Sequence, residues 1–115
     1  MSHVAHKHLQ GMGFTDKEAK VYLTCLKSGT CTVAKIAESA GVKRPTTYVM
    51  LKQLMDKELV ELVKKGKKTY FSALHPHQLK KHVEKERDLL TQKESILTEL
   101  LPIIVPMAEE NVSAE

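Results

Sequence analysis

The chain has 115 residues, a net charge of +4 at pH 7 and 42% apolar residues, but no Trp and only 4% aromatic residues. This length suits one domain with a single core, which must be mainly aliphatic. No nucleophile–base arrangement, paired-acid motif or glycine-rich phosphate loop is present, so we expect a protein that is not an enzyme and carries no cofactor. No apolar signal segment opens the chain, and the run at 100–108 is too short to span a bilayer; both favour a cytoplasmic protein.

Positive charge is concentrated in one part of the chain. Residues 43–68 contain eight Lys or Arg and three acidic residues, whereas residues 69–115 contain five basic and eight acidic residues. A local excess of this kind is typical of a surface that binds nucleic acid. A charge run can also be a solvated surface that keeps the protein soluble, so the structural context decides between the two.

Two helices are predicted in the first third of the chain. Residues 14–29 begin with Thr15 followed by Glu18, the capping-box spacing, and Gly29 ends them. Residues 32–41 begin at a Thr and end at a Gly, with apolar residues at helical spacing. The segment before them is expected to be a flexible end.

A third helix is predicted at about residues 44–57, after a turn of about three residues. Thr47, Leu51, Leu54 and Glu58 fall on one side of a helical wheel, and Pro45 suits the first turn. Two helices joined by a short turn, with their apolar faces inward, form a helix-turn-helix unit.

Residues 59–74 show a period near two, interrupted by Gly66 within KKGKK, which predicts a β-hairpin with a basic tip. We therefore expect a mainly α fold with a small hairpin (α+β), a winged helix-turn-helix domain at residues 1–75.

Residues 76–108 predict a long C-terminal helix that serves for dimerisation, followed by a frayed tail at 109–115. The helix should end or kink at Pro102, which lacks a donor and clashes with the preceding turn. Glu86 and Lys93 interrupt its apolar stripe and argue against a long parallel coiled coil; an antiparallel pair, or packing against the first helix of the partner, suits them better. A second copy is the expected cover for the stripe, which gives a homodimer. The stripe consists of Leu79, Val83, Leu90, Leu97, Leu100 and Ile104.

The third helix carries hydrogen-bond donors on its outer side, which suits a helix lying in the major groove of double-stranded DNA. We expect Arg44 and Gln53 to read bases, and Val49 to touch a thymine methyl group. The hairpin tip, residues 64–68, should contact the adjacent backbone or minor groove, which gives affinity but no sequence information. The candidate DNA-binding residues are Lys43, Arg44, Thr46, Tyr48, Val49, Lys52, Gln53, Lys64, Lys65, Lys67 and Lys68.

About two-thirds of the chain resembles the winged-helix domain of the TrmB family of transcription regulators. The resemblance rests on GFTDKEAKVYL, IAESAGV, TTYVMLKQL and KELVELVKKGKKTYFSAL. It implies binding of duplex DNA by a dimer, with Arg44, Thr46, Tyr48 and the wing lysines at matching positions. The chain differs from the family at Val49, where a basic residue is usual, and at Pro45, where a small polar residue is common. Longer members carry a C-terminal sugar-binding domain, and the resemblance carries over no effector pocket.

Two other functions remain open at this point. A winged helix with a basic face can dock an acidic protein partner, which predicts binding that does not distinguish DNA sequences. A regulator can also sense thiol chemistry or metals, through Cys25 and Cys31 or through the histidines, although the spacing matches no common four-ligand metal site. The six histidines are His3, His6, His8, His75, His77 and His82. The sequence identifies neither the operator nor an effector.

Overall fold

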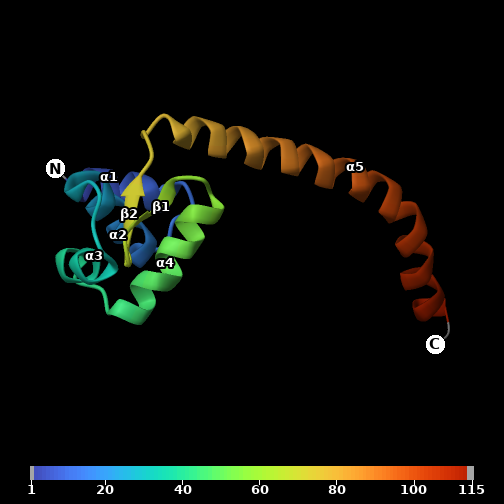
Figure 1. The fold of residues 1–115 in the computed structure, drawn as a ribbon. Helices are drawn as coiled ribbons and strands as arrows, with labels where there is room; N and C mark the ends of the chain where they lie inside the picture. Colours follow the sequence, from blue (N-terminus) through green and yellow to red (C-terminus); the bar gives the residue numbers. More distant parts are fainter. Residues whose placement is uncertain (1, 114–115) are drawn as a thin grey trace. The chain divides into compact units, whose positions relative to one another are not determined.

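Five helices and one antiparallel hairpin make up residues 2–113, the part of the chain that the computed structural model describes (Figure 1). Residues 1–79 form one unit and residues 80–115 a second. The expected fold class is confirmed: the chain is mainly α with a small hairpin, a winged helix-turn-helix followed by a long helix. The elements are α1 (Ser2–Gly11), α2 (Asp16–Ser28), α3 (Val33–Ala40), α4 (Arg44–Asp56), β1 (Val60–Lys65), β2 (Lys68–Ala73) and α5 (Gln78–Ser113).

The predicted helix ends of α2 and α3 are confirmed by their caps. The Thr15 hydroxyl accepts a bond from the Glu18 N–H at 3.1 Å, and the Glu18 carboxylate accepts one from the Thr15 N–H at 3.4 Å. These two bonds form the complete capping box. Gly41 ends α3 in the left-handed conformation, with φ of 69°, which a residue without Cβ adopts at little cost.

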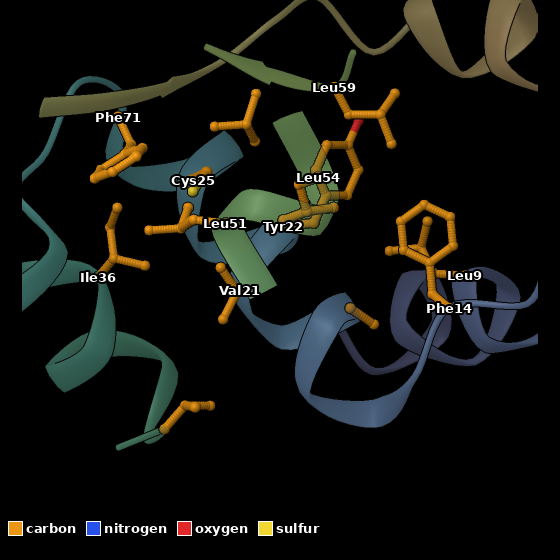
Figure 2. Close-up of a cluster of buried hydrophobic side chains, with 13 residues drawn as sticks. Leu9, Phe14, Val21, Tyr22, Cys25, Ile36, Leu51, Leu54, Leu59 and Phe71 are labelled. Atoms are coloured by element: carbon orange, nitrogen blue, oxygen red, sulfur yellow. The ribbon is translucent and has the colours of Figure 1, made fainter. Parts of the chain in front are cut away.

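The core lies where α2, α3 and α4 meet the hairpin. Figure 2 shows Tyr22, Ile36, Leu51 and Leu54 converging from these three helices, with Phe71 from β2 beside them. Thr47 is also fully buried, and its hydroxyl donates to the carbonyl of Lys43 at 2.9 Å. The prediction of which side of the third helix faces the core is therefore correct for the residues within α4.

Glu58 is the exception, because it lies beyond the end of α4. Its φ of 60° turns the chain out of the helix, and its side chain is exposed rather than on the buried side. Lys57, at the helix end, instead turns toward α2. Its Nζ lies 2.7 Å from the Glu18 carboxylate and 4.5 Å from the centre of the Phe14 ring. The ion pair thus joins the start of α2 to the end of α4.

The N-terminal segment is a helix, α1, where we expected a flexible end. Leu9 is buried in the core cluster, and the Phe14 N–H donates to the Leu9 carbonyl at 3.1 Å. A single buried residue in a His-rich segment gives a weak periodic signal. The helix is stabilised by its packing on α2, which the local sequence does not reveal.

The hairpin has the expected basic tip, and it also pairs with a third segment that the sequence did not predict. β1 and β2 pair so that Lys65 faces Lys68, which leaves Gly66 and Lys67 as a two-residue turn. Gly66 has φ of 64°, as its first central position requires in a type II′ turn. Phe71 also exchanges both backbone bonds with Cys31, at 3.0 and 2.7 Å. The segment before α3 thereby anchors the hairpin.

α5 continues as a helix to Ser113, with Pro102 and Pro106 inside it. The sequence predicted an end or kink at Pro102; the helix does not end there, but Figure 1 shows its axis turning in the C-terminal part. Residues 109–113 belong to the helix where a frayed tail was expected, and residues 114–115 lie outside the described part. The exposed surroundings explain this, because water can satisfy the carbonyl groups that the prolines leave unpaired.

Candidate nucleic-acid interface

The outer face of α4 carries the predicted donors. Arg44, Lys52 and Gln53 are exposed, and Tyr48 and Val49 keep about half of their surface in solvent, at 52% and 51%. Thr46 is half-buried, so its hydroxyl lies at the edge of this face. The buried side of the same helix holds it against α2 and α3. Five of the six α4 candidates are therefore available to a partner along one rigid element.

The start of α4 favours an anion. Its N-cap residue, Lys43, makes no side-chain cap bond, and its first turn contains no acidic residue. Helix N-terminal N–H groups and the helix dipole attract negative charge there. Pro45 removes one donor from this turn, but Arg44 and Lys43 add two positive side chains next to it. The arrangement suits a DNA phosphate near the turn between α3 and α4.

The wing concentrates four positive charges around a tight turn. Lys64, Lys65, Lys67 and Lys68 are all exposed, and among residues 2–113 no carboxylate pairs with any of them. Lys65 extends along Tyr70, with its Nζ 5.9 Å from the ring centre. Such charges repel one another, and a polyanion that lies along them relieves that repulsion.

Lys57 is basic but is not part of this surface. Its charge is neutralised by Glu18, whose side chain is only 3% exposed, and it lies over Phe14. The count of positive charges in residues 43–68 therefore overstates the charge available to DNA. Sequence reasoning did not pair these two residues, which are 39 positions apart.

The two thiols lie in different surroundings. Cys25 is 1% exposed, and burial raises the pKa of its thiol to about 12. Its reactive thiolate is thus strongly disfavoured. Cys31 is half-buried, and its thiol donates to the carbonyl of Ser28 at 3.5 Å. Both cysteines are free.

Several histidines make separate local contacts. Within residues 2–113, no three His, Cys, Asp or Glu side chains are grouped as metal ligands. The Nε2 of His6 lies 2.9 Å from Asp16, and that of His82 lies 3.2 Å from Glu86. His75 and His77 contact each other, with ring centres 4.6 Å apart. These positions do not favour the metal hypothesis.

The predicted dimerisation stripe divides into two parts. Leu79 is half-buried and packs against the core of residues 1–79, so its surface is largely used within the chain. The members on α5 beyond it are exposed; Leu97, for example, keeps 48% of its surface in solvent. Further apolar residues widen the exposed face. They are Leu89, Ile96, Leu101, Ile103, Val105 and Met107.

Comparison with known proteins finds matches over most of the chain. A family model described as "Sugar-specific transcriptional regulator TrmB" matches residues 9–77. TrmBL2 of Pyrococcus furiosus, named as an HTH-type transcriptional regulator, is 29% identical over 100 residues, which are 83% of this chain and 38% of that protein. The solved structure of TrmBL2, described as an archaeal chromatin protein with a novel mode of DNA binding, matches with a TM-score of 0.70 and 26% identity. That match covers 97% of this chain and 46% of the other, so the chain spans less than half the length of these relatives.

A more distant match supports the fold alone. A MarR family transcriptional regulator from Silicibacter pomeroyi is 16% identical, with a TM-score of 0.56 over 99% of this chain and 81% of that one. The matched proteins are regulators and DNA-binding proteins rather than enzymes. Between residues 2 and 113, no helix is both long and apolar enough to cross a membrane.

Proposed function

Since the chain belongs to the TrmB family of transcriptional regulators, we propose that it binds specific sequences of double-stranded DNA as a homodimer. In this proposal α4 lies in the major groove and the wing, residues 64–68, lies on the adjacent backbone or minor groove. The observation that carries it is the exposed donor face of α4, on a helix whose opposite side is fixed in the core. In helix-turn-helix proteins the second helix of the unit lies in the major groove, which supports this assignment.

The α4 side chains divide by chemistry into base readers and phosphate contacts. The guanidinium of Arg44 can donate two bonds to guanine, and the amide of Gln53 can pair with adenine. Lys43, Tyr48 and Lys52 suit phosphate oxygens, and Val49 offers an apolar contact to a thymine methyl group. Thr46, at the edge of the face, can donate a hydrogen bond from its hydroxyl to a base or to a phosphate oxygen. The wing lysines add affinity that is independent of sequence.

A second copy of the chain is the proposed cover for α5. Val83, Leu90, Leu97 and Ile104 recur every seven residues, and all four are exposed. A coiled helix pair buries such a repeat, and several half-exposed Leu or Ile side chains each contribute on the order of 1 kcal/mol when covered. A two-fold dimer also presents two α4 helices to a pseudo-palindromic site.

The polar residues of the stripe favour an antiparallel pair. In a parallel pair Glu86 would face Glu86 of the other copy, and Lys93 would face Lys93. An antiparallel pair centred near Leu97 brings the apolar residues between 89 and 107 together. It also places Glu86 of one copy away from Glu86 of the other, which removes the contact between like charges.

The test is a binding titration of the intact protein with duplex DNA. A duplex selected from genomic fragments should bind more than tenfold tighter than a random duplex of equal length. If each subunit neutralises about three phosphates, the logarithm of affinity should fall against the logarithm of salt with a slope of about −5. Absence of binding at low salt, or a flat salt dependence, would refute the DNA proposal.

Binding of DNA without sequence preference is the second candidate. TrmBL2, the matched solved structure, is described as an archaeal chromatin protein. In addition, α4 exposes Pro45 and Val49, neither of which has a side-chain donor for a base edge. If selected and random duplexes bind within about threefold of each other with the same steep salt slope, this candidate replaces sequence-specific regulation.

A further inference from the structure

A pocket outside the proposed DNA surface lies among α1, α2 and the end of α3. Its volume is about 550 Å³, within the range of small-molecule sites. The outer side of α2 contributes Lys20, Leu23, Thr24 and Lys27, which point away from the buried side of that helix. α1 contributes one wall, and the last residues of α3 contribute the other.

The lining carries an excess of positive groups. Lys7, Lys20 and Lys27 lie there together with the imidazoles of His3 and His6, and no carboxylate is part of the lining. Three ammonium groups around one concave surface repel one another, which is a cost that an occupying anion removes.

A carboxylate outside the lining neutralises only part of this charge. Asp16 lies 3.1 Å from the Nζ of Lys20 and 2.9 Å from the Nε2 of His6. The Lys20 ammonium, by hydrogen bonding, is the main cause that lowers the pKa of Asp16, which keeps that carboxylate ionised. Lys7 and Lys27 have no acidic partner within residues 2–113. Two positive charges are therefore left for a ligand.

The pocket also has apolar and hydroxyl surface. Leu23 packs partly on the core and faces the pocket, with Ala40 at its α3 wall. Ser39 and Thr24 add hydroxyl groups, although that of Thr24 donates to the Lys20 carbonyl at 2.8 Å. A ligand that fits both kinds of surface is an anion with a small apolar body. A free inorganic ion would leave the Leu23 surface unused.

We propose that this pocket binds a small organic anion, a carboxylate or phosphate ester, through Lys7 and Lys27. The proposal is independent of the DNA-binding proposal, because no candidate DNA contact lines the pocket. It concerns a molecule of low molecular weight. A contact of the same lysines with a DNA backbone is a different outcome, which the experiment separates.

The experiment titrates the full-length protein with phenyl phosphate and follows backbone amide shifts by NMR. Saturable shifts are expected in residues 6–10 and 20–27. Inorganic phosphate should bind the same residues more weakly, since it lacks the apolar part, and benzyl alcohol should not bind, since it lacks the charge. Saturable shifts with none of this selectivity, or shifts spread over all lysine-rich surfaces, would overturn the proposal.

Variants test the assigned residues. Lys7→Met with Lys27→Met should weaken phenyl phosphate binding by about tenfold, because two charge-assisted contacts are lost. Ser39→Glu, which adds a negative charge at the wall, should weaken it without touching either lysine. The matched control is Lys80→Met with Lys81→Met, which removes the same charge from exposed positions on α5 and should change affinity less than twofold. Unchanged affinity for phenyl phosphate in the first two variants would refute the assignment of this binding site.

A separate arm measures DNA affinity of the Lys7/Lys27 variant. If phenyl phosphate does not bind and this variant lowers the salt slope of DNA binding by about two, the lysines contact DNA and the small-anion proposal is wrong.

Discussion

Loss of either charge of the Lys57–Glu18 ion pair should destabilise the winged domain, and loss of the lysine should cost more than loss of the glutamate charge. The Nζ–Oε2 distance is 2.7 Å, and the exposed fractions of the two side chains are 27% for Lys57 and 3% for Glu18. Removal of the lysine leaves a buried carboxylate with one remaining donor, the Thr15 N–H. Breaking a fully buried pair costs about 3–5 kcal/mol, and because the lysine end is partly wet we expect about 2–3 kcal/mol for Lys57→Met.

Removal of the negative charge of Glu18 should cost less unfolding free energy than removal of Lys57. Glu18→Gln keeps an oxygen that can accept from the Thr15 N–H, and the unpaired ammonium of Lys57 can reach water and stays over the Phe14 ring. We therefore expect about 1–2 kcal/mol. The double variant should lose less than the two single losses combined, since each single change breaks the same contact.

The assay is urea unfolding followed by circular dichroism at one fixed protein concentration, because association changes apparent stability. Lys52→Met is the matched control: it removes a lysine from the exposed face of α4 and should change the unfolding free energy by less than about 0.5 kcal/mol. If Lys57→Met lies within 0.5 kcal/mol of this control, the pair contributes nothing measurable and the reasoning fails.

Three further predictions concern recognition, assembly and pH. Arg44→Ala should cost about 1–3 kcal/mol of DNA binding and relax preference at one base pair, whereas Lys67→Ala should weaken all duplexes alike; equal, sequence-blind losses would make Arg44 a phosphate contact. Leu97→Asp should convert the dimer to a monomer in sedimentation at micromolar concentration, and a wild-type monomer there would refute the assembly. Burial raises the pKa of Cys25 from 9.0 to about 12, so above pH 9 the unfolded state releases a proton that the folded state keeps. Stability should then fall by up to about 1.4 kcal/mol per pH unit, and Cys25→Ala should make the fall shallower in urea unfolding at pH 9 to 11.

Features that depend on nearby residues were predictable from the sequence. The Thr15–Glu18 capping box, the helix end at Gly41 and the Gly66 turn are each decided within four residues, and each is confirmed. The inner side of α4 was also readable, because Thr47 and Leu51 repeat at helical spacing. These signals sufficed for the winged-helix fold.

Features that join distant residues were not predictable in this way. The Lys57–Glu18 ion pair spans 39 positions and the β-bridge between Cys31 and Phe71 spans 40, so neither leaves a periodic signal in the sequence. α1 depends on packing around Leu9. The continuation of α5 past Pro102 was missed because the sequence records the lost donor but not the exposed surroundings that tolerate it.

The Cys31–Phe71 bridge has a consequence for how the wing opens. The hairpin is local in sequence, but its attachment to Cys31 closes a loop of about forty residues and rests on two backbone bonds. Phe71 and Val60 at the base of the hairpin are also buried in the core, so the base opens only when the core does, whereas the exposed tip can fray locally. Amide hydrogens at the tip, residues 64–68, would exchange with solvent through this local fraying, while those of the buried α4 turns around Leu51 would wait for global unfolding. Because only the tip frays at a small free-energy cost, residues 64–68 can adapt to the proposed DNA contact, while the base of the hairpin and α4 keep their positions.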